Sequence, residues 1–217
     1  MRATGARIIS SATSVDEALW LEARGVDAVI AQGAEAGGHR GIFLANALGE
    51  DPIDIAASQA GTFALVPQVA DAVKVPVIAA GGITDARGIA AALALGAAGV
   101  QIGTAYLHTP EARISAAHRA ALSTAKDNGT ALTNVFTGRP ARGIVNRIMR
   151  EVGPISREAP AFPLASAALA PLKKTPNGPA DFSSLWSGQA ARLGRAMPAG
   201  ELTRHLAREA LAIINRR

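Results

Sequence analysis

The chain has 217 residues, enough for one domain with a sizeable core, and 49% of them are hydrophobic while 18% are charged. The formal net charge of +5 comes from arginines scattered along the chain, which indicates a solvated basic surface and no nucleic-acid partner. The lack of cysteine excludes disulfides, zinc–thiolate sites and thiol catalysis within the chain.

Short, continuously apolar runs alternate with helix-like segments through the first half of the chain. The runs that suit strands lie at residues 7–10, 27–31, 75–80 and 99–102. Strands without polar alternation are typical of a parallel sheet that helices bury on both faces. The repeating strand–helix order therefore predicts an α/β fold with right-handed crossovers.

Helices are expected between these strands, at residues 14–24, 67–74 and 84–96. Ser14 and Glu17 have the spacing of a capping box at the start of the first helix. Thr84 or Asp85 would cap the third helix. The longer step between the second and third strands leaves an inserted loop at about residues 40–61.

The pattern changes in the second half. Residues 108–125 suit a helix, residues 134–179 suit an irregular lid rich in proline and arginine, and residues 200–215 suit a final helix. We therefore predict a partial TIM (β/α) barrel, made of about the last four βα units, over residues 1–125. An irregular and helical C-terminal extension would occupy residues 126–217.

The first residues lack the apolar core of a secretion signal. The one long uncharged stretch, residues 89–107, is interrupted by glycines and suits a helix, a turn and a buried strand better than a membrane span. We expect a cytoplasmic protein without a membrane partner.

Two glycine turns follow neighbouring strands of the predicted sheet. Gly81 and Gly82 follow the third strand, and Gly103 and Thr104 follow the fourth. Glycine lets a backbone approach an anion closely, and N–H groups that open a helix can point at phosphate. In (β/α) barrels the loops after the last two strands commonly form one phosphate site. We predict phosphate binding here; the alternative is a pair of purely structural turns.

A second glycine-rich run, QGAEAGGHRG at residues 32–41, follows the second strand and so lies at the active-site end of the sheet. Gly37 and Gly38 would let the backbone pass close to a flat ligand, with His39 at the edge of that ligand. A neutral imidazole can accept a proton from a carbon acid. The alternative is a loop histidine that is hydrogen-bonded to backbone.

Glu35 and Arg40 lie in the same run and are interpreted as charges that order the loop. No triplet of His, Asp and Glu has the spacing of metal ligands, so no metal is predicted.

Six runs together resemble the nitronate monooxygenase family, formerly called 2-nitropropane dioxygenase. They are SSAT at residues 10–13, AQGAEAGGHRG at 31–41, PVIAAGGI at 76–83, VQIGT at 100–104, GRPARGIVN at 138–146 and LWSGQ at 185–189. The resemblance covers nearly the whole chain. It implies an FMN-binding TIM barrel that oxidises alkyl nitronates with O₂ to a carbonyl compound and nitrite.

Carried over residue by residue, the resemblance also implies a set of site residues. The cofactor-binding positions are Gln32, Gly37, Gly38, Gly81, Gly82, Gln101, Ile102, Gly103 and Thr104. Gln32 and Gly37 would contact the flavin, while Gly82 and residues 101–104 would hold the FMN phosphate. His39 matches the active-site histidine of the family, the base or the orienter of the nitro substrate.

Members of that family normally have about four more βα units ahead of the first strand seen here. Four strands cannot close a barrel, so the strands centred on Ile8 and Val100 would both be open edges. We expect a fragment of a longer gene product. The alternatives are self-association of two copies through the open edges, or a separate chain that supplies the first half.

Two other functions fit the same residues. An FMN-dependent enoyl-thioester reductase of the same superfamily shares the Gly-Gly-His loop, although Arg40, Gly41 and the run at residues 138–143 favour the monooxygenase. An inactive flavin- or phosphate-binding remnant is the third possibility.

Overall fold

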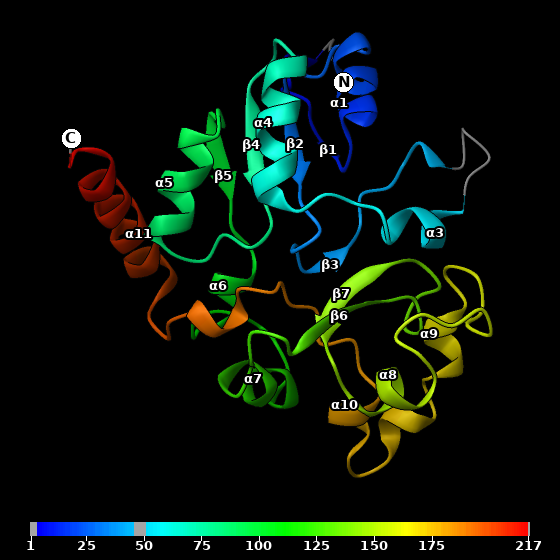
Figure 1. Ribbon diagram of the computed structural model, residues 1–217. Helices are drawn as coiled ribbons and strands as arrows, with labels where there is room; N and C mark the ends of the chain where they lie inside the picture. The colour runs from blue at the N-terminus through cyan, green and yellow to red at the C-terminus, as the bar shows by residue number, and fades with distance from the viewer. Residues whose placement is uncertain (1–3, 46–50, 217) are drawn as a thin grey trace.

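The computed structural model describes residues 4–45 and 51–216, and its first half forms a four-stranded parallel sheet. The strands are β1 (Ile9–Ala12), β2 (Ala28–Gln32), β4 (Val77–Ala80) and β5 (Gly99–Gln101), in the order β1-β2-β4-β5 (Figure 1). The predicted α/β class and four parallel strands are confirmed. The first strand begins two residues later than predicted because the Asp27 carboxylate, 2.7 Å away, accepts the N–H of Ile8.

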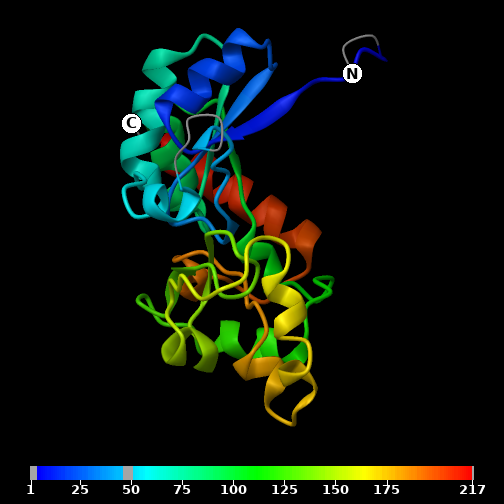
Figure 2. The same ribbon diagram turned by 90° about the vertical axis from the view of Figure 1, so that its right-hand side faces the viewer.

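Three helices cover one face of this sheet: α1 (Val15–Ala23), α4 (Thr62–Ala72) and α5 (Ala86–Ala94). Figure 2 shows α1 and α4 on the same side of the strands. The main core lies between the layers, where Val29 and Val77 of the sheet pack with Val66 and Val69 of α4. Burial of each such side chain contributes about 1.5–3 kcal/mol. Among the described residues, β1 and β5 each pair with one neighbour and are the edges of the sheet.

The predicted capping box of α1 forms only in part. Ser14 Oγ accepts the N–H of Glu17 at 3.2 Å, as expected of an N-cap. The Glu17 carboxylate is buried and instead accepts the N–H of Thr13 at 2.6 Å and that of Phe43 at 2.8 Å. Glu17 therefore ties the loop after β3 to the start of α1.

Helix α4 begins at Thr62, five residues before its predicted start, and Pro67 lies inside it. The carboxylate of Glu35, on a distant loop, accepts the N–H of Thr62 at 2.7 Å. This tertiary cap has no local sequence signal, so the start predicted at Pro67 is wrong. The predicted loop at residues 40–61 contains the short helix α3 (Pro52–Ala56), and residues 46–50 of it lie outside the described residues.

A second, antiparallel sheet, which the sequence did not predict, joins one strand of the first half to two strands of the second half. Its strands β3 (Gly38–His39), β7 (Ala141–Ile144) and β6 (Thr130–Thr133) pair in that order. The predicted helix at residues 108–125 is shorter, α7 (Ala116–Ser123), because Ser115 caps it; the four-residue α6 (Thr104–Leu107) precedes it. The region predicted as an irregular lid includes β7 and the short elements α8 (Arg147–Glu151), α9 (Ala165–Ala168), η2 (Leu172–Lys174) and α10 (Gly178–Asp181).

The final helix, predicted at residues 200–215, is confirmed as α11 (Ala199–Ile214) and follows the 3₁₀ turn η3 (Ala191–Leu193). It returns to the first sheet and lies against α5 (Figure 1), where Leu202 and Leu206 pack with Ala105. Over the described residues, no helix is long and apolar enough to cross a membrane.

Candidate active site

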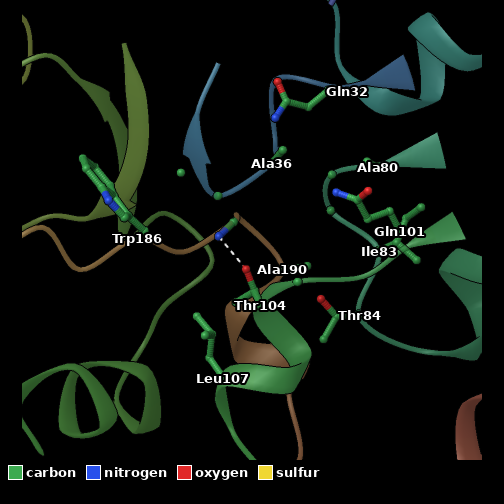
Figure 3. A pocket seen from close by; sticks show the side chains of 16 residues that line it. Gln32, Ala36, Ala80, Ile83, Thr84, Gln101, Thr104, Leu107, Trp186 and Ala190 are labelled. Carbon is green, nitrogen blue, oxygen red and sulfur yellow. Dashed lines mark hydrogen bonds between the residues drawn. The ribbon is translucent and has the colours of Figure 1, made fainter. Parts of the chain in front are cut away.

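A cavity of about 240 Å³ lies at the carboxyl ends of β2, β4 and β5. Gln32, Ala80 and Gln101 occupy equivalent positions on these strands, so their side chains leave the same face of the sheet (Figure 3). The lining consists of Gln32, Ala36, Gly37, Gly38, Ala80, Gly81, Gly82, Ile83, Thr84, Gln101, Gly103, Thr104, Leu107, Trp186, Gly188 and Ala190. The cavity is therefore walled both by strand ends and by segments of the extension.

Gly81 and Gly82 adopt left-handed backbone conformations that favour glycine, with φ of +110° and +68°. The Thr62 hydroxyl is 2.8 Å from the Gly81 carbonyl, to which it can donate. A Cβ on Gly81 would come within 2.9 Å of that hydroxyl oxygen. The Gly82 N–H donates to no other described residue and remains available to a ligand.

The turn after β5 supplies further donors. A Cβ on Gly103 would meet nothing within 4 Å, so this backbone borders open space. Among the described residues no acceptor pairs with the N–H groups of Gly103 and Thr104. The Thr104 hydroxyl accepts the N–H of Gly188 at 2.9 Å, as the dashed line in Figure 3 marks. Two glycine turns thus present unpaired N–H groups to one cavity, an arrangement suited to an anion.

The opposite wall comes from Trp186, Gly188 and Ala190, which sequence reasoning gave no role. Gly37 packs closely on this wall, because a Cβ there would lie 2.6 Å from the Gly188 nitrogen. The run LWSGQ, residues 185–189, carries part of the family resemblance. No local signal in the sequence indicates that this run lies at the carboxyl ends of β2, β4 and β5.

His39 lies in a neighbouring cavity of about 270 Å³ that shares Gln32 with the first one. Its lining residues are Ser11, Gln32, His39, Arg40, Gly41, Phe43, Arg139 and Phe162. The imidazole centroid is 5.5 Å from the ring of Trp186 and 6.3 Å from that of Phe162. Desolvation by partial burial, and secondarily the positive charge of Arg139, lower the pKa of His39 below its usual 6.5. The ring is therefore neutral at pH 7.

Glu35 and Arg40 order the loop, as predicted. The Glu35 carboxylate binds the backbone and hydroxyl of Thr62 at 2.7 and 2.9 Å. Arg40 is buried and donates to the carbonyls of Gly33 and Gln32, each at 2.6 Å. Burial lowers the pKa of Arg40 to about 10, with a smaller contribution from the neighbouring charge of Arg142.

Eight of the nine predicted cofactor-binding residues line the first cavity. Ile102 does not, because its side chain packs in the apolar cluster with Leu202 and Leu206. His39 borders the second cavity instead. In the part of the chain that the structure describes, no three His, Cys, Asp or Glu side chains come close enough to hold a metal ion.

Comparison with protein families gives one match over almost the whole chain. The family described as nitronate monooxygenase matches residues 1–209. A protein of Staphylococcus saprophyticus named probable nitronate monooxygenase is 43% identical over 212 residues, which are 97% of this chain and 58% of the relative. The chain thus spans somewhat more than half the length of that relative.

Two solved structures are also similar over nearly all of the chain. Nitroalkane oxidase from Streptomyces ansochromogenes is 42% identical with a TM-score of 0.86, covering 97% of this chain and 59% of its own. FabK from Thermotoga maritima is 30% identical with a TM-score of 0.80, covering 99% of this chain and 64% of its own.

Proposed function

Because the chain belongs to the nitronate monooxygenase family, we propose that it carries the FMN- and substrate-binding residues of an enzyme that oxidises alkyl nitronates. In that reaction O₂ is the oxidant, and the products are a carbonyl compound and nitrite. The observation that best supports the proposal is the pair of adjoining cavities, one rich in unpaired N–H groups and one holding His39. A nitroalkane oxidase is among its similar structures.

The residues of the first cavity fit the phosphate of FMN. The N–H groups of Gly82, Gly103 and Thr104 would donate to phosphate oxygens, and the open space beside Gly103 leaves room for them. Gln101 would offer its amide group to the flavin. Gln32, on the same row of the sheet, accepts the Gly41 N–H at 2.8 Å and donates to the His39 carbonyl at 3.2 Å, so only its second N–H would remain for the flavin. FMN bound there would supply the electron-transfer chemistry with O₂.

The second cavity fits an alkyl nitronate, which is an anion with an apolar tail. Phe43 and Phe162 offer apolar surface, and Arg139 offers a positive charge close to His39. A neutral His39 would accept a proton from the carbon of a neutral nitroalkane, which gives the nitronate, or it would help to orient a nitronate that binds directly. Gln32 lines both cavities and would lie between cofactor and substrate.

Nitrite release with FMN and propyl-2-nitronate tests this function. Purified chain should show flavin absorbance after dialysis against FMN and should release nitrite, whereas His39→Gln should lose at least about tenfold in kcat/KM. His205→Gln, a substitution on α11, is the matched control and should behave as wild type. Absence of nitrite at every FMN concentration would refute the proposal for this chain.

A second candidate is the enoyl-thioester reductase, and the similarity to FabK favours keeping it. NADH consumption with an enoyl thioester, without nitrite from nitronates, would identify it. The higher identity to the nitroalkane oxidase, 42% against 30%, makes the monooxygenase the first choice. We further propose that the edges of β1 and β5 are covered by association, either with a second copy or with further βα units.

A further inference from the structure

The hydroxyl of Thr137 lies against the imidazole of His39, 98 residues away in the sequence. Its oxygen is 2.9 Å from His39 Nε2. Backbone pairing between β3 and β7, with His39 opposite Ala141, brings the two side chains together. Thr137 lies in the turn just before β7, so the contact is set by the sheet and by that turn.

The same hydroxyl has two other neighbours, both on the backbone of Arg139. The Arg139 carbonyl lies 3.3 Å away as an acceptor, and the Arg139 N–H lies 3.4 Å away as a donor. Among the described residues no other group donates to that carbonyl. A hydroxyl has one proton and two lone pairs. With its proton on the Arg139 carbonyl, the hydroxyl can only accept from His39.

We propose that Thr137 is a positioning residue that selects the His39 tautomer with the proton on Nε2. The lone pair is then on Nδ1, which has no hydrogen-bond partner among the described residues. This inference rests on the proposed function in the form in which His39 accepts a proton from the carbon of a nitroalkane. In the other tautomer, the nitrogen that remains for a substrate would already carry a proton.

Two aromatic rings lie near the imidazole, which is itself exposed to solvent. Trp186 lies at a tilt of 59° to the ring of His39, and Phe162 meets that ring edge-on at 83°. A flip of the ring would place a carbon where Nε2 meets Thr137. Such a flip would break the contact with Thr137, so the hydrogen bond itself favours the observed orientation.

Long-range ¹H–¹⁵N correlation spectra of histidine-labelled full chain, recorded above pH 7, test the proposal. The spectra distinguish protonated from unprotonated ring nitrogens, and His39→Gln identifies the signal among the 4 histidines. Wild type should carry its proton on Nε2. Thr137→Val, which keeps the shape but removes the hydroxyl, should lower the Nε2–H to Nδ1–H ratio about fivefold. Thr137→Ser should restore it.

A proton on Nδ1 in the wild type, or a ratio unchanged in Thr137→Val, would overturn the proposal. Should Thr137→Val not fold, Thr137→Ala, which also removes the hydroxyl, takes its place and should lower the ratio in the same way. The measurement needs neither flavin nor nitronate. A correct tautomer without nitrite release would therefore refute the proposed function alone.

Discussion

The Thr104 hydroxyl accepts the backbone N–H of Gly188 at 2.9 Å, across 84 residues of sequence. Thr104 opens the short helix after β5, and Gly188 belongs to the segment that forms the opposite wall of the first cavity. This hydrogen bond helps to join the parallel sheet to the extension, next to the Gln189 N–H, which donates to the Glu35 carbonyl at 3.0 Å. Both bonds hold the opposite wall of the cavity in place.

Removal of this hydrogen bond should weaken cofactor binding more than it weakens the fold. In Thr104→Val the Gly188 N–H loses its acceptor, and the dissociation constant for FMN should rise about two- to tenfold. Quenching of FMN fluorescence measures the constant. Thr104→Ser should bind as wild type, and Thr124→Val on α7 is the control for loss of an exposed hydroxyl. An unchanged constant in Thr104→Val would show that the wall is held by other contacts.

Gly81 cannot carry a side chain in its observed conformation. Gly81→Ala combines a φ of +110° with a Cβ 2.9 Å from the Thr62 hydroxyl, so it should cost more than the roughly 1–2 kcal/mol of the left-handed conformation alone. Urea denaturation measures the loss, and FMN binding should disappear. Gly5→Ala, with a φ of +73° and nothing within 4 Å, separates strain from crowding. Equal losses in both variants would rule out crowding.

The pKa of His39 predicts the acid side of the pH profile. Because its folded pKa is lowered below 6.5, the imidazole stays neutral as the pH falls through 6.5, and kcat/KM should decline only at lower pH. Arg139→Gln removes a positive charge that lowers this pKa, so the acid limb should move to higher pH. An NMR titration of His39 gives the same pKa without turnover. A limb that moves to lower pH in Arg139→Gln would contradict the assignment.

Arg40 should contribute to stability rather than to chemistry. Arg40→Met would remove the guanidinium that donates to the carbonyls of Gly33 and Gln32, of which Gly33 keeps only the N–H of Ala36. The loss should cost about 2–5 kcal/mol in the free energy of unfolding. Arg87→Met, which removes an exposed partner of Asp85, is the control and should change that free energy little. Folded Arg40→Met that binds FMN normally but releases no nitrite would assign Arg40 a catalytic role instead.

Local signals allowed the four parallel strands, the glycine turns and the ends of α1, α5 and α11 to be predicted. Gly81, Gly103 and the Asp85 cap, for instance, each depend on residues within a few positions. The start of α4 at Thr62 and the strand at His39 depend on partners far along the chain, Glu35 and Ala141. The wall containing Trp186 was missed for the same reason, since periodicity carries no information on long-range pairing.

Helix α11 has a consequence for the order in which the chain acquires its structure. Its contacts with α5 join segments about 110 residues apart, and they cover an apolar surface that includes Ala105. During synthesis that surface stays uncovered until α11 leaves the ribosome. A stop codon or a protease cut before residue 199 would therefore leave this apolar surface exposed, and the truncated protein would be prone to aggregation. A C-terminal fusion partner, by contrast, would follow a helix that has already docked.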